Sequence, residues 1–340
     1  MLSSLAIGFQ RVRAAPAVLV AVYLVTLGAA LPLALVLRAE VRAHLGASLM
    51  AETAATGVDW DWWQEFSSQA RGLGDSFTPS VIGFAAPLSN LSAFADGTRQ
   101  PLPIVAAAAG YGAIWLFLWG GILDRYARAR ETRAHGFFAA AGVFFFRFLR
   151  LGLVAGLLYW LLLGPVREWL FETIDDRLTL NVTVERVAFA WRLGAYVVIG
   201  AALVAVNLVV DYAKIRAVVE DRRSMLGALV AGARFVVRQP AGVVGLYALN
   251  GLLFLTVLAV YALVAPGAGG DGMAVWGTLL VGQVYLLGRL ALRLLFAASQ
   301  ICFFQSRLAH AGYAAFPAPE WPESPDVESI VNAGHAAGGR

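Results

Sequence analysis

Six long apolar stretches run through this 340-residue chain and constrain its fold more than any other feature. Each is close to the roughly 20 residues that a helix needs to cross a hydrocarbon core about 30 Å thick. Hydrophobic residues make up 59% of the chain and charged residues 14%, whereas soluble domains have about 45–50% and about 25%. We therefore predict an all-α polytopic membrane bundle of six transmembrane helices. The expected spans are residues 14–37, 102–123, 148–166, 193–210, 241–265 and 273–297.

The basic residues indicate how these spans are oriented. With the N-terminus in the cytoplasm, 18 of the 26 Lys and Arg residues fall on the cytoplasmic side and 8 on the other, as the positive-inside rule requires. Topology thus accounts for the net charge of +4, and we predict no nucleic-acid partner. The first apolar run exceeds the roughly 7–15 residues of a signal peptide core, so we expect it to be retained.

The use of Arg in place of Lys, together with many Ala and Gly residues, is typical of a bacterial protein of high genomic GC content. We therefore predict a multi-pass protein of the bacterial inner membrane. Both termini are expected to be cytoplasmic.

Two distant stretches share one pattern. GFQRVRAAPAVLVAVY at 8–23 matches GARFVVRQPAGVVGLY at 232–247, including a proline and a tyrosine. A weaker copy, FFFRFLRLGLVAGLLY at 144–159, has glycine at the proline position. Because proline in a first helical turn costs no hydrogen bond, each copy predicts a short interfacial helix, a bend and a membrane helix. The expected bends, or elbows, are at Pro16, Gly152 and Pro240.

The repeat divides the predicted membrane domain, residues 1–308, into three related units. They are residues 1–133, 134–222 and 223–308, with an extracytoplasmic insertion at 38–101. Internal repeats of this kind are common in membrane transport folds. The remaining residues, 309–340, form a Pro- and Gly-rich cytoplasmic tail that is expected to be extended or disordered.

Charged residues near the inner ends of the spans are the main candidates for a site. An unpaired charge in the bilayer centre costs at least about 2.5–3.5 kcal/mol, so such residues pair or reach the headgroups, bind a ligand or lipid headgroup, or line a proton or ion path. We predict an intramembrane charge cluster with at least one carboxylate–guanidinium pair, and all three roles remain open. Its expected members are Asp124, Arg147, Asp211, Arg289 and Arg293.

Shorter-range polar contacts are also expected in the spans. Asp124 and Asp211 are each followed within about one turn by a base, Arg128 and Lys214, that can pair on the same helix. Polar residues deeper in the spans are more typical of interhelical hydrogen bonds than of ligand sites. They are Asn207, Asn250 and Gln283.

The predicted extracytoplasmic insertion contains DWDWWQEF at 59–66. Trp60, Trp63 and Phe66 fall at helical spacing. This spacing favours a helix that lies on the outer surface of the bilayer, where tryptophan is common. A partner-docking surface and a ligand lid are the alternatives. The predicted anchor comprises Trp60, Trp62, Trp63 and Phe66, and the apolar tract 81–94 is expected beside it.

Motifs for common chemistry are missing. The chain has no GxxxxGK[ST], HExxH or convincing GxSxG pattern, and its four histidines are widely spaced. The single cysteine, Cys302, excludes an intrachain disulfide or a CxxC pair. We predict no metal site, no cofactor and no enzymatic activity.

The stretch DYAKIRAVVEDRRSMLGALVAGARF at 211–235, followed by a proline and a membrane helix, supports one resemblance. It resembles uncharacterised six-helix bacterial membrane proteins, which are similar in layout to the membrane domain fused to some glycerophosphodiester phosphodiesterases. The resemblance covers the last two units and implies the six-helix layout. It implies no catalytic residue, because the phosphodiesterase catalytic domain is absent.

Two classes of function follow from these patterns. The first is a non-enzymatic scaffold, assembly or regulatory factor, and the second is a permease or lipid-handling protein with a charged cavity on the cytoplasmic side. An intramembrane hydrolase is a third, less favoured class. Polar residues gathered around an open cavity would favour transport, whereas a filled bundle would favour a scaffold. The expected partners are membrane lipids and another membrane or extracytoplasmic protein.

Overall fold

The computed structural model describes residues 1–46, 48, 50–56, 59–74, 77, 102–129, 132–180, 182–265 and 272–307. Every regular element within these residues is helical, and six helices are long and apolar enough to cross a membrane, as the sequence predicts. The helices are α1 (Leu2–Arg13), α2 (Pro16–Leu45), α3 (Ala51–Thr56), α4 (Trp60–Gln69), α6 (Leu102–Arg128), α7 (Ala134–Leu161), η2 (Leu162–Val166), η3 (Trp169–Asp175), α8 (Asp176–Thr179), α9 (Glu185–Val219), α10 (Met225–Arg238), α11 (Pro240–Val264) and α12 (Met273–Arg307).

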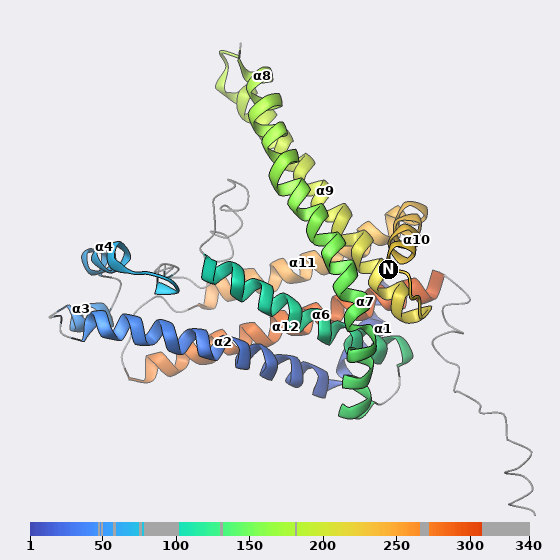
Figure 1. Ribbon diagram of the computed structural model, residues 1–340, viewed down its shortest axis with the longest axis horizontal. Coiled ribbons are helices and arrows are strands. Elements are labelled where there is room, and N and C mark those ends of the chain that lie inside the picture. Colours follow the sequence, from blue (N-terminus) through green and yellow to red (C-terminus); the bar gives the residue numbers. More distant parts are fainter. Residues whose placement is uncertain are drawn as a thin grey trace, which may run out of the picture.

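The six long helices have two directions (Figure 1). Helices α2, α6, α11 and α12 run side by side in one layer, in which α12 contacts the other three. Helices α7 and α9 form a hairpin that rises away from this layer. All six meet at one end of the molecule, beside the short helices α1 and α10, and we call this the convergent end.

Two of the three expected elbow positions stand at helix breaks. Helix α1 ends at Arg13 and α2 begins at Pro16, while α10 ends at Arg238 and α11 begins at Pro240. Each proline lies at the first position of its helix, where its missing N–H is not needed.

The elbow expected at Gly152 is wrong. Helix α7 runs without interruption from Ala134 to Leu161 across this residue. Glycine lowers helix propensity but keeps its backbone N–H, so it does not force a break as proline does. The helix therefore continues past Gly152, and its hairpin leaves the four-helix layer (Figure 1).

The segment before each membrane helix packs on a long helix that belongs to a different predicted unit. Helix α1 packs on α12, α10 packs on α9, and the first half of α7 packs on α6. A Cβ atom at Gly8 of α1 would lie 2.8 Å from the Ser299 nitrogen, and one at Gly232 of α10 would lie 2.9 Å from the Ala213 nitrogen. Both glycines of the repeated phrase thus permit close helix contact.

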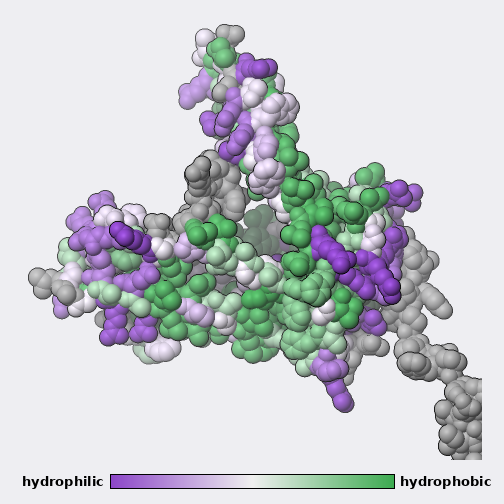
Figure 2. Space-filling view, viewed as in Figure 1, coloured by the Kyte–Doolittle hydropathy of each residue, from purple (hydrophilic) through white to green (hydrophobic). Residues whose placement is uncertain are grey.

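The buried core lies at the convergent end. Its largest fully buried side chains include Tyr126, Tyr212, Phe303 and Phe304. The opposite halves of the long helices are mostly exposed and apolar, and Leu263 near the end of α11 is 87% exposed. Figure 2 shows this apolar surface between hydrophilic groups that gather at the extremities. Such a distribution fits a protein whose long helices are surrounded by lipid.

Candidate functional site

A cavity of about 720 Å³ lies where α9 leaves the four-helix layer. Figure 2 shows a hollow between the base of the α7–α9 hairpin and this layer. The polar and charged lining residues come from five helices, α2, α6, α9, α11 and α12. They are Thr26, Tyr111, Trp119, Asn207, Asp211, Lys214, Tyr247, Asn250, Arg289, Arg293 and Gln300.

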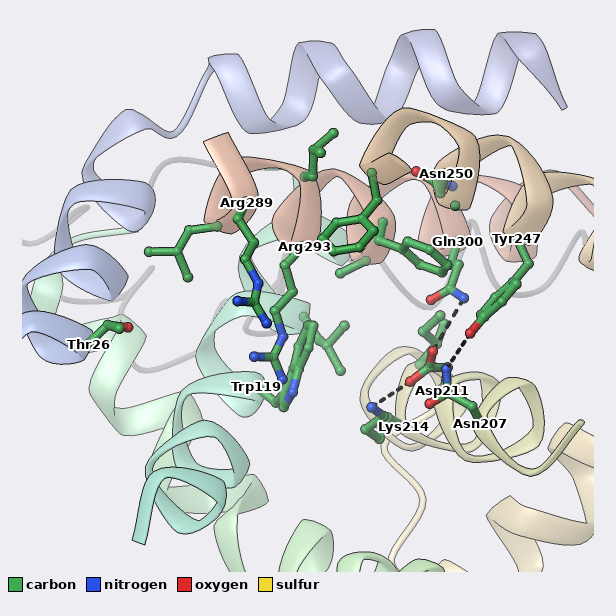
Figure 3. A pocket seen from close by; sticks show the side chains of 18 of the residues that line it. Thr26, Trp119, Asn207, Asp211, Lys214, Tyr247, Asn250, Arg289, Arg293 and Gln300 are labelled. Carbon is green, nitrogen blue, oxygen red and sulfur yellow. Dashed lines mark hydrogen bonds and ion pairs between the residues drawn. The ribbon is translucent and has the colours of Figure 1, made fainter. Parts of the chain in front are cut away.

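Helix α12 supplies two arginines to one side of the cavity. Arg289 and Arg293 are four residues apart, so they share a face of the helix. Figure 3 shows both side chains extending in the same direction. The Arg293 guanidinium lies over the Trp115 ring, 3.5 Å from its centroid, and 5.6 Å from the centroid of Trp119. These contacts place the Arg293 guanidinium on an aromatic wall formed by α6.

Helix α9 supplies most of the opposite, hydrogen-bonded side (Figure 3). Lys214 Nζ lies 2.6 Å from Asp211 Oδ1, and Gln300 Nε2 donates to Asp211 Oδ2 at 3.5 Å. Asn207 Nδ2 donates to the Tyr247 hydroxyl at 3.1 Å. Both side chains of the ion pair are largely buried, 17% exposed for Asp211 and 15% for Lys214. On this side, Asp211 and Lys214 therefore balance each other's charge.

Trp119 connects the two sides. The Lys214 ammonium lies 4.9 Å from its ring centroid, and the Arg293 guanidinium lies 5.6 Å from it. An aromatic face attracts each cation without cancelling its charge. The indole thus keeps two positive groups near one another in a place that is poor in carboxylates.

The charge of the cavity lining is positive. Lys214, Arg289 and Arg293 contribute three positive charges and Asp211 one negative charge, which leaves a balance of two positive charges. Among the described residues, neither arginine has a carboxylate within ion-pair distance. Both arginine residues are exposed to the open space of the cavity. The arrangement can bind an anion.

The predicted charge cluster is brought together only in part. Asp211, Arg289 and Arg293 line the cavity, but among the described residues no carboxylate of the cluster pairs with a guanidinium of the cluster. Asp211 pairs with Lys214 instead. A partner three residues away on the same helix is already positioned, so it competes well with one on another helix.

The other two cluster members lie outside the cavity. Asp124 accepts from Arg128 Nε at 2.7 Å, which confirms the pairing expected along that helix. Arg147 donates from Nη1 to Asp221 Oδ1 at 2.6 Å, at the turn between α9 and α10.

The deeper polar residues make interhelical hydrogen bonds, as predicted. Asn250 Nδ2 donates to Ser299 Oγ at 3.1 Å, and Tyr23 donates to Gln283 Oε1 at 2.8 Å. Tyrosines at the matching repeat positions hydrogen-bond to one amide, Asn207. Tyr159 donates to its Oδ1 at 3.5 Å, and Tyr247 accepts from its Nδ2.

Sequence reasoning did not assign Trp115, Trp119 or Gln300 to the site, although the tryptophans share a helix face at i and i+4.

The anchor expected at the outer interface of the bilayer, helix α4, packs part of its aromatic face against the protein. Trp62 and Phe66 are buried, and the Trp62 indole donates to His44 Nδ1 at 3.0 Å near the end of α2. Trp63 donates to the Phe77 carbonyl at 3.3 Å, and Trp60 is 56% exposed. Phe66, at helical spacing from Trp60 and Trp63, stacks on Trp62 one turn away. Tract 81–94 and tail 309–340 lie outside the described residues.

Comparison of this chain with protein-family models, with curated proteins and with solved structures finds no match. The similarity to the membrane domain of some phosphodiesterases therefore stays a prediction. Within the described residues, no three His, Cys, Asp or Glu side chains gather in a group that could hold a metal ion.

Proposed function

We propose that this protein binds an anionic molecule in the cavity and acts as a permease or lipid-handling protein of the bacterial inner membrane. The observation that carries the proposal is the pair of α12 arginines, which face open space without a carboxylate partner among the described residues. Of the two classes of function that the sequence leaves open, this arrangement favours the one with a charged cavity.

The energetic cost of the two arginines supports a binding role. A charge costs about 2.5–3.5 kcal/mol at the centre of a membrane helix and less near its ends, and like charges four residues apart repel each other. The structure offsets part of this cost by cation–π contact with Trp115 and Trp119. An anion between the guanidiniums would offset the rest through charge-assisted hydrogen bonds.

The proposal places the convergent end in the cytoplasm, together with both termini. The prevalence of Lys and Arg in the segments near that end supports this orientation. A cysteine in place of exposed Arg223 should then be protected from an impermeant thiol reagent in intact cells. A cysteine in place of exposed Ser68 of α4 should react, and the reverse pattern would overturn the orientation.

We further propose that the membrane domain consists of three related units. Packing supports this division, since α1, α10 and the first half of α7 each lie on a long helix from another unit. The second unit differs from the others because Gly152 stands where they have a proline, and α7 continues through it. Its hairpin thereby leaves space beside α11 and α12, where the cavity lies.

A scaffold role remains the second candidate, and one observation favours it. The α7–α9 hairpin exposes large aromatic side chains, including Trp160, Trp169 and Trp191 at 63%, 58% and 48%. Such residues suit lipid contact and also helix–helix contact with another membrane protein. The scaffold proposal assigns no role to the cavity arginines, and for that reason we rank it second.

Analysis of what copurifies from native membranes tests the proposal. The wild-type chain should retain a small anionic molecule, and the double variant Arg289→Gln/Arg293→Gln should lose it. Arg150→Gln is the matched control, because it removes the same charge from an exposed position on α7 outside the cavity. Stoichiometric copurification of a protein with no small anion would instead favour the scaffold.

A further inference from the structure

We infer that the cavity takes the headgroup of an anionic phospholipid from the inner leaflet. This inference rests on the proposed function and identifies the class of its ligand. The shared chemistry is a phosphate group between the two guanidiniums of Arg289 and Arg293. Guanidinium is planar and offers paired donors, which match the oxygens of a phosphate.

The depth of the arginines agrees with a headgroup site. Arg289 and Arg293 follow Met273, the first residue of α12, by 16 and 20 residues. At about 1.5 Å per residue, these positions lie about 24 Å and about 30 Å along the helix. If the helix starts at the outer boundary of a hydrocarbon core about 30 Å thick, both arginines lie near the inner boundary. Inner-leaflet phosphates lie at this depth.

The surroundings of the cavity favour access from the bilayer. On the side of the convergent end, the buried core lies next to it, with Tyr126, Tyr212 and Phe304 fully buried. On the other side, the α9 segment 193–206, the α11 segment 251–264 and the α12 segment 273–288 carry no charged residue. A molecule that approaches the arginines along these helices meets an apolar environment, which suits acyl chains.

The lining itself is amphipathic. Apolar side chains from α11 and α12, Phe254, Leu286 and Phe296, share the cavity with the charged groups. Opposite the arginines, Asn207 and Gln300 present amide groups within hydrogen-bonding networks. An anionic phospholipid fits each part, because its phosphate would meet the arginines, its polar alcohol the amides and its first methylene groups the apolar residues.

The test measures equilibrium binding to the purified full chain in a non-ionic detergent. The probes are phosphatidylglycerol, phosphatidylcholine with identical acyl chains, and glycerol 3-phosphate. We expect phosphatidylglycerol to bind at least about tenfold more tightly than either of the others. Arg289→Gln/Arg293→Gln should weaken its binding by about tenfold or more, while Arg150→Gln should leave it unchanged.

A conservative variant separates loss of charge from loss of fold. Arg289→Lys/Arg293→Lys keeps both positive charges but not the paired donors, so its affinity should lie between wild type and the Gln variant. Elution of each variant as a single monodisperse species on size-exclusion chromatography checks its fold. Equal affinity of the Gln variant and wild type for phosphatidylglycerol would place lipid binding elsewhere and overturn the inference.

The remaining outcomes separate this inference from the proposed function. If glycerol 3-phosphate binds as tightly as the lipid and depends on the arginines, the ligand is a soluble phosphate and the lipid inference fails while the anion site stands. If phosphatidylcholine binds as tightly as phosphatidylglycerol, recognition of a net anionic headgroup fails. If none of the three binds, both the inference and the proposed function are overturned.

Discussion

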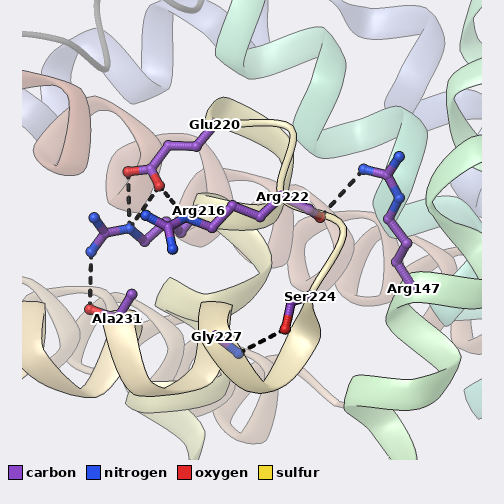
Figure 4. A network of polar contacts seen from close by, with 7 residues as sticks. All are labelled: Arg147, Arg216, Glu220, Arg222, Ser224, Gly227 and Ala231. Carbon is purple, nitrogen blue, oxygen red and sulfur yellow. Dashed lines mark hydrogen bonds and ion pairs between the residues drawn. The ribbon is translucent and has the colours of Figure 1, made fainter.

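Two groups of charged residues lie near the convergent end, and they differ in how their charges are balanced. At the turn between α9 and α10, Glu220 accepts from both Arg216 and Arg222 (Figure 4). Asp221 at the same turn accepts from Arg147. In the cavity, Asp211 accepts from Lys214, whereas the two arginines of α12 have no carboxylate partner among the described residues.

The difference separates a structural role from a binding role. At the α9–α10 turn, Arg216 also donates from Nη1 to the Ala231 carbonyl at 3.0 Å and so connects α9 to α10. Ser224 accepts from the Gly227 N–H at 3.2 Å and caps α10. Each of the three arginines there, Arg147, Arg216 and Arg222, has a carboxylate acceptor in the chain. The cavity arginines instead leave donors for a molecule that is not part of the chain.

Removal of Glu220 should have the largest effect on stability. Its side chain is 9% exposed, and Glu220→Ala would leave the 16%-exposed Arg216 side chain without its carboxylate. Breaking a buried pair in this way destabilises by about 3–5 kcal/mol, and we expect the lower end because Arg222 is 40% exposed. Unfolding of the purified protein in detergent measures the change.

The neighbouring carboxylate provides the control for this variant. Asp221 is 75% exposed and has φ 47°, a conformation that asparagine tolerates. Asp221→Asn should therefore cost less than about 1 kcal/mol. If both variants lose the same stability, the turn does not depend on burial of Glu220.

Asp211→Asn should lower stability by an intermediate amount and strengthen anion binding. The change leaves the Lys214 ammonium without its carboxylate, 2.6 Å away, and should cost about 1–3 kcal/mol. It also raises the positive balance of the cavity from two charges to three. Anion affinity should rise several-fold, in contrast with the loss expected for Arg293→Gln. A fall in affinity for both variants would show that Asp211 itself contacts the ligand.

Much of the helical architecture is predictable because apolar length and proline chemistry are local properties. The six spans and the helix starts at Pro16 and Pro240 follow from such patterns. The uninterrupted course of α7 is less predictable. The repeat alignment predicts a bend at Gly152, which glycine permits but does not impose. Similarity in sequence thus overstated similarity in backbone path.

The candidate site was predictable only along single helices. Spacing places Arg289 and Arg293 on one face of α12 and Lys214 within reach of Asp211. The space between α9 and α12 depends on how two distant helices diverge, and no pattern along one helix encodes this. Trp119 joins the site for the same reason, since its role arises from cations on two other helices.

Arg147→Gln tests a weaker, partly exposed pair at the α9–α10 turn. Arg147 is 18% exposed, but its partner Asp221 is 75% exposed, so solvent screens their attraction. We expect a loss of about 1 kcal/mol or less in the free energy of unfolding. Anion binding should be unchanged, because Arg147 does not line the cavity. Weakened binding in this variant would mean that the α9–α10 turn and the cavity are coupled.

Arg289→Gln should have the smallest effect on stability, although it removes a full charge from a membrane helix. The variant breaks no ion pair with the described residues and relieves repulsion from Arg293, four residues away. Relief of such repulsion contributes about 0.2–0.5 kcal/mol, so we expect stability without ligand to stay constant or rise slightly.

Arg216→Gln is the contrasting variant, since it removes an arginine that donates to both Glu220 and the Ala231 carbonyl. Arg216→Gln should therefore lose stability and keep anion binding, whereas Arg289→Gln should lose anion binding and keep stability. If Arg289→Gln destabilises the ligand-free protein as much as Arg216→Gln does, then the cavity arginines serve the fold, and the distinction between the two groups of charges disappears.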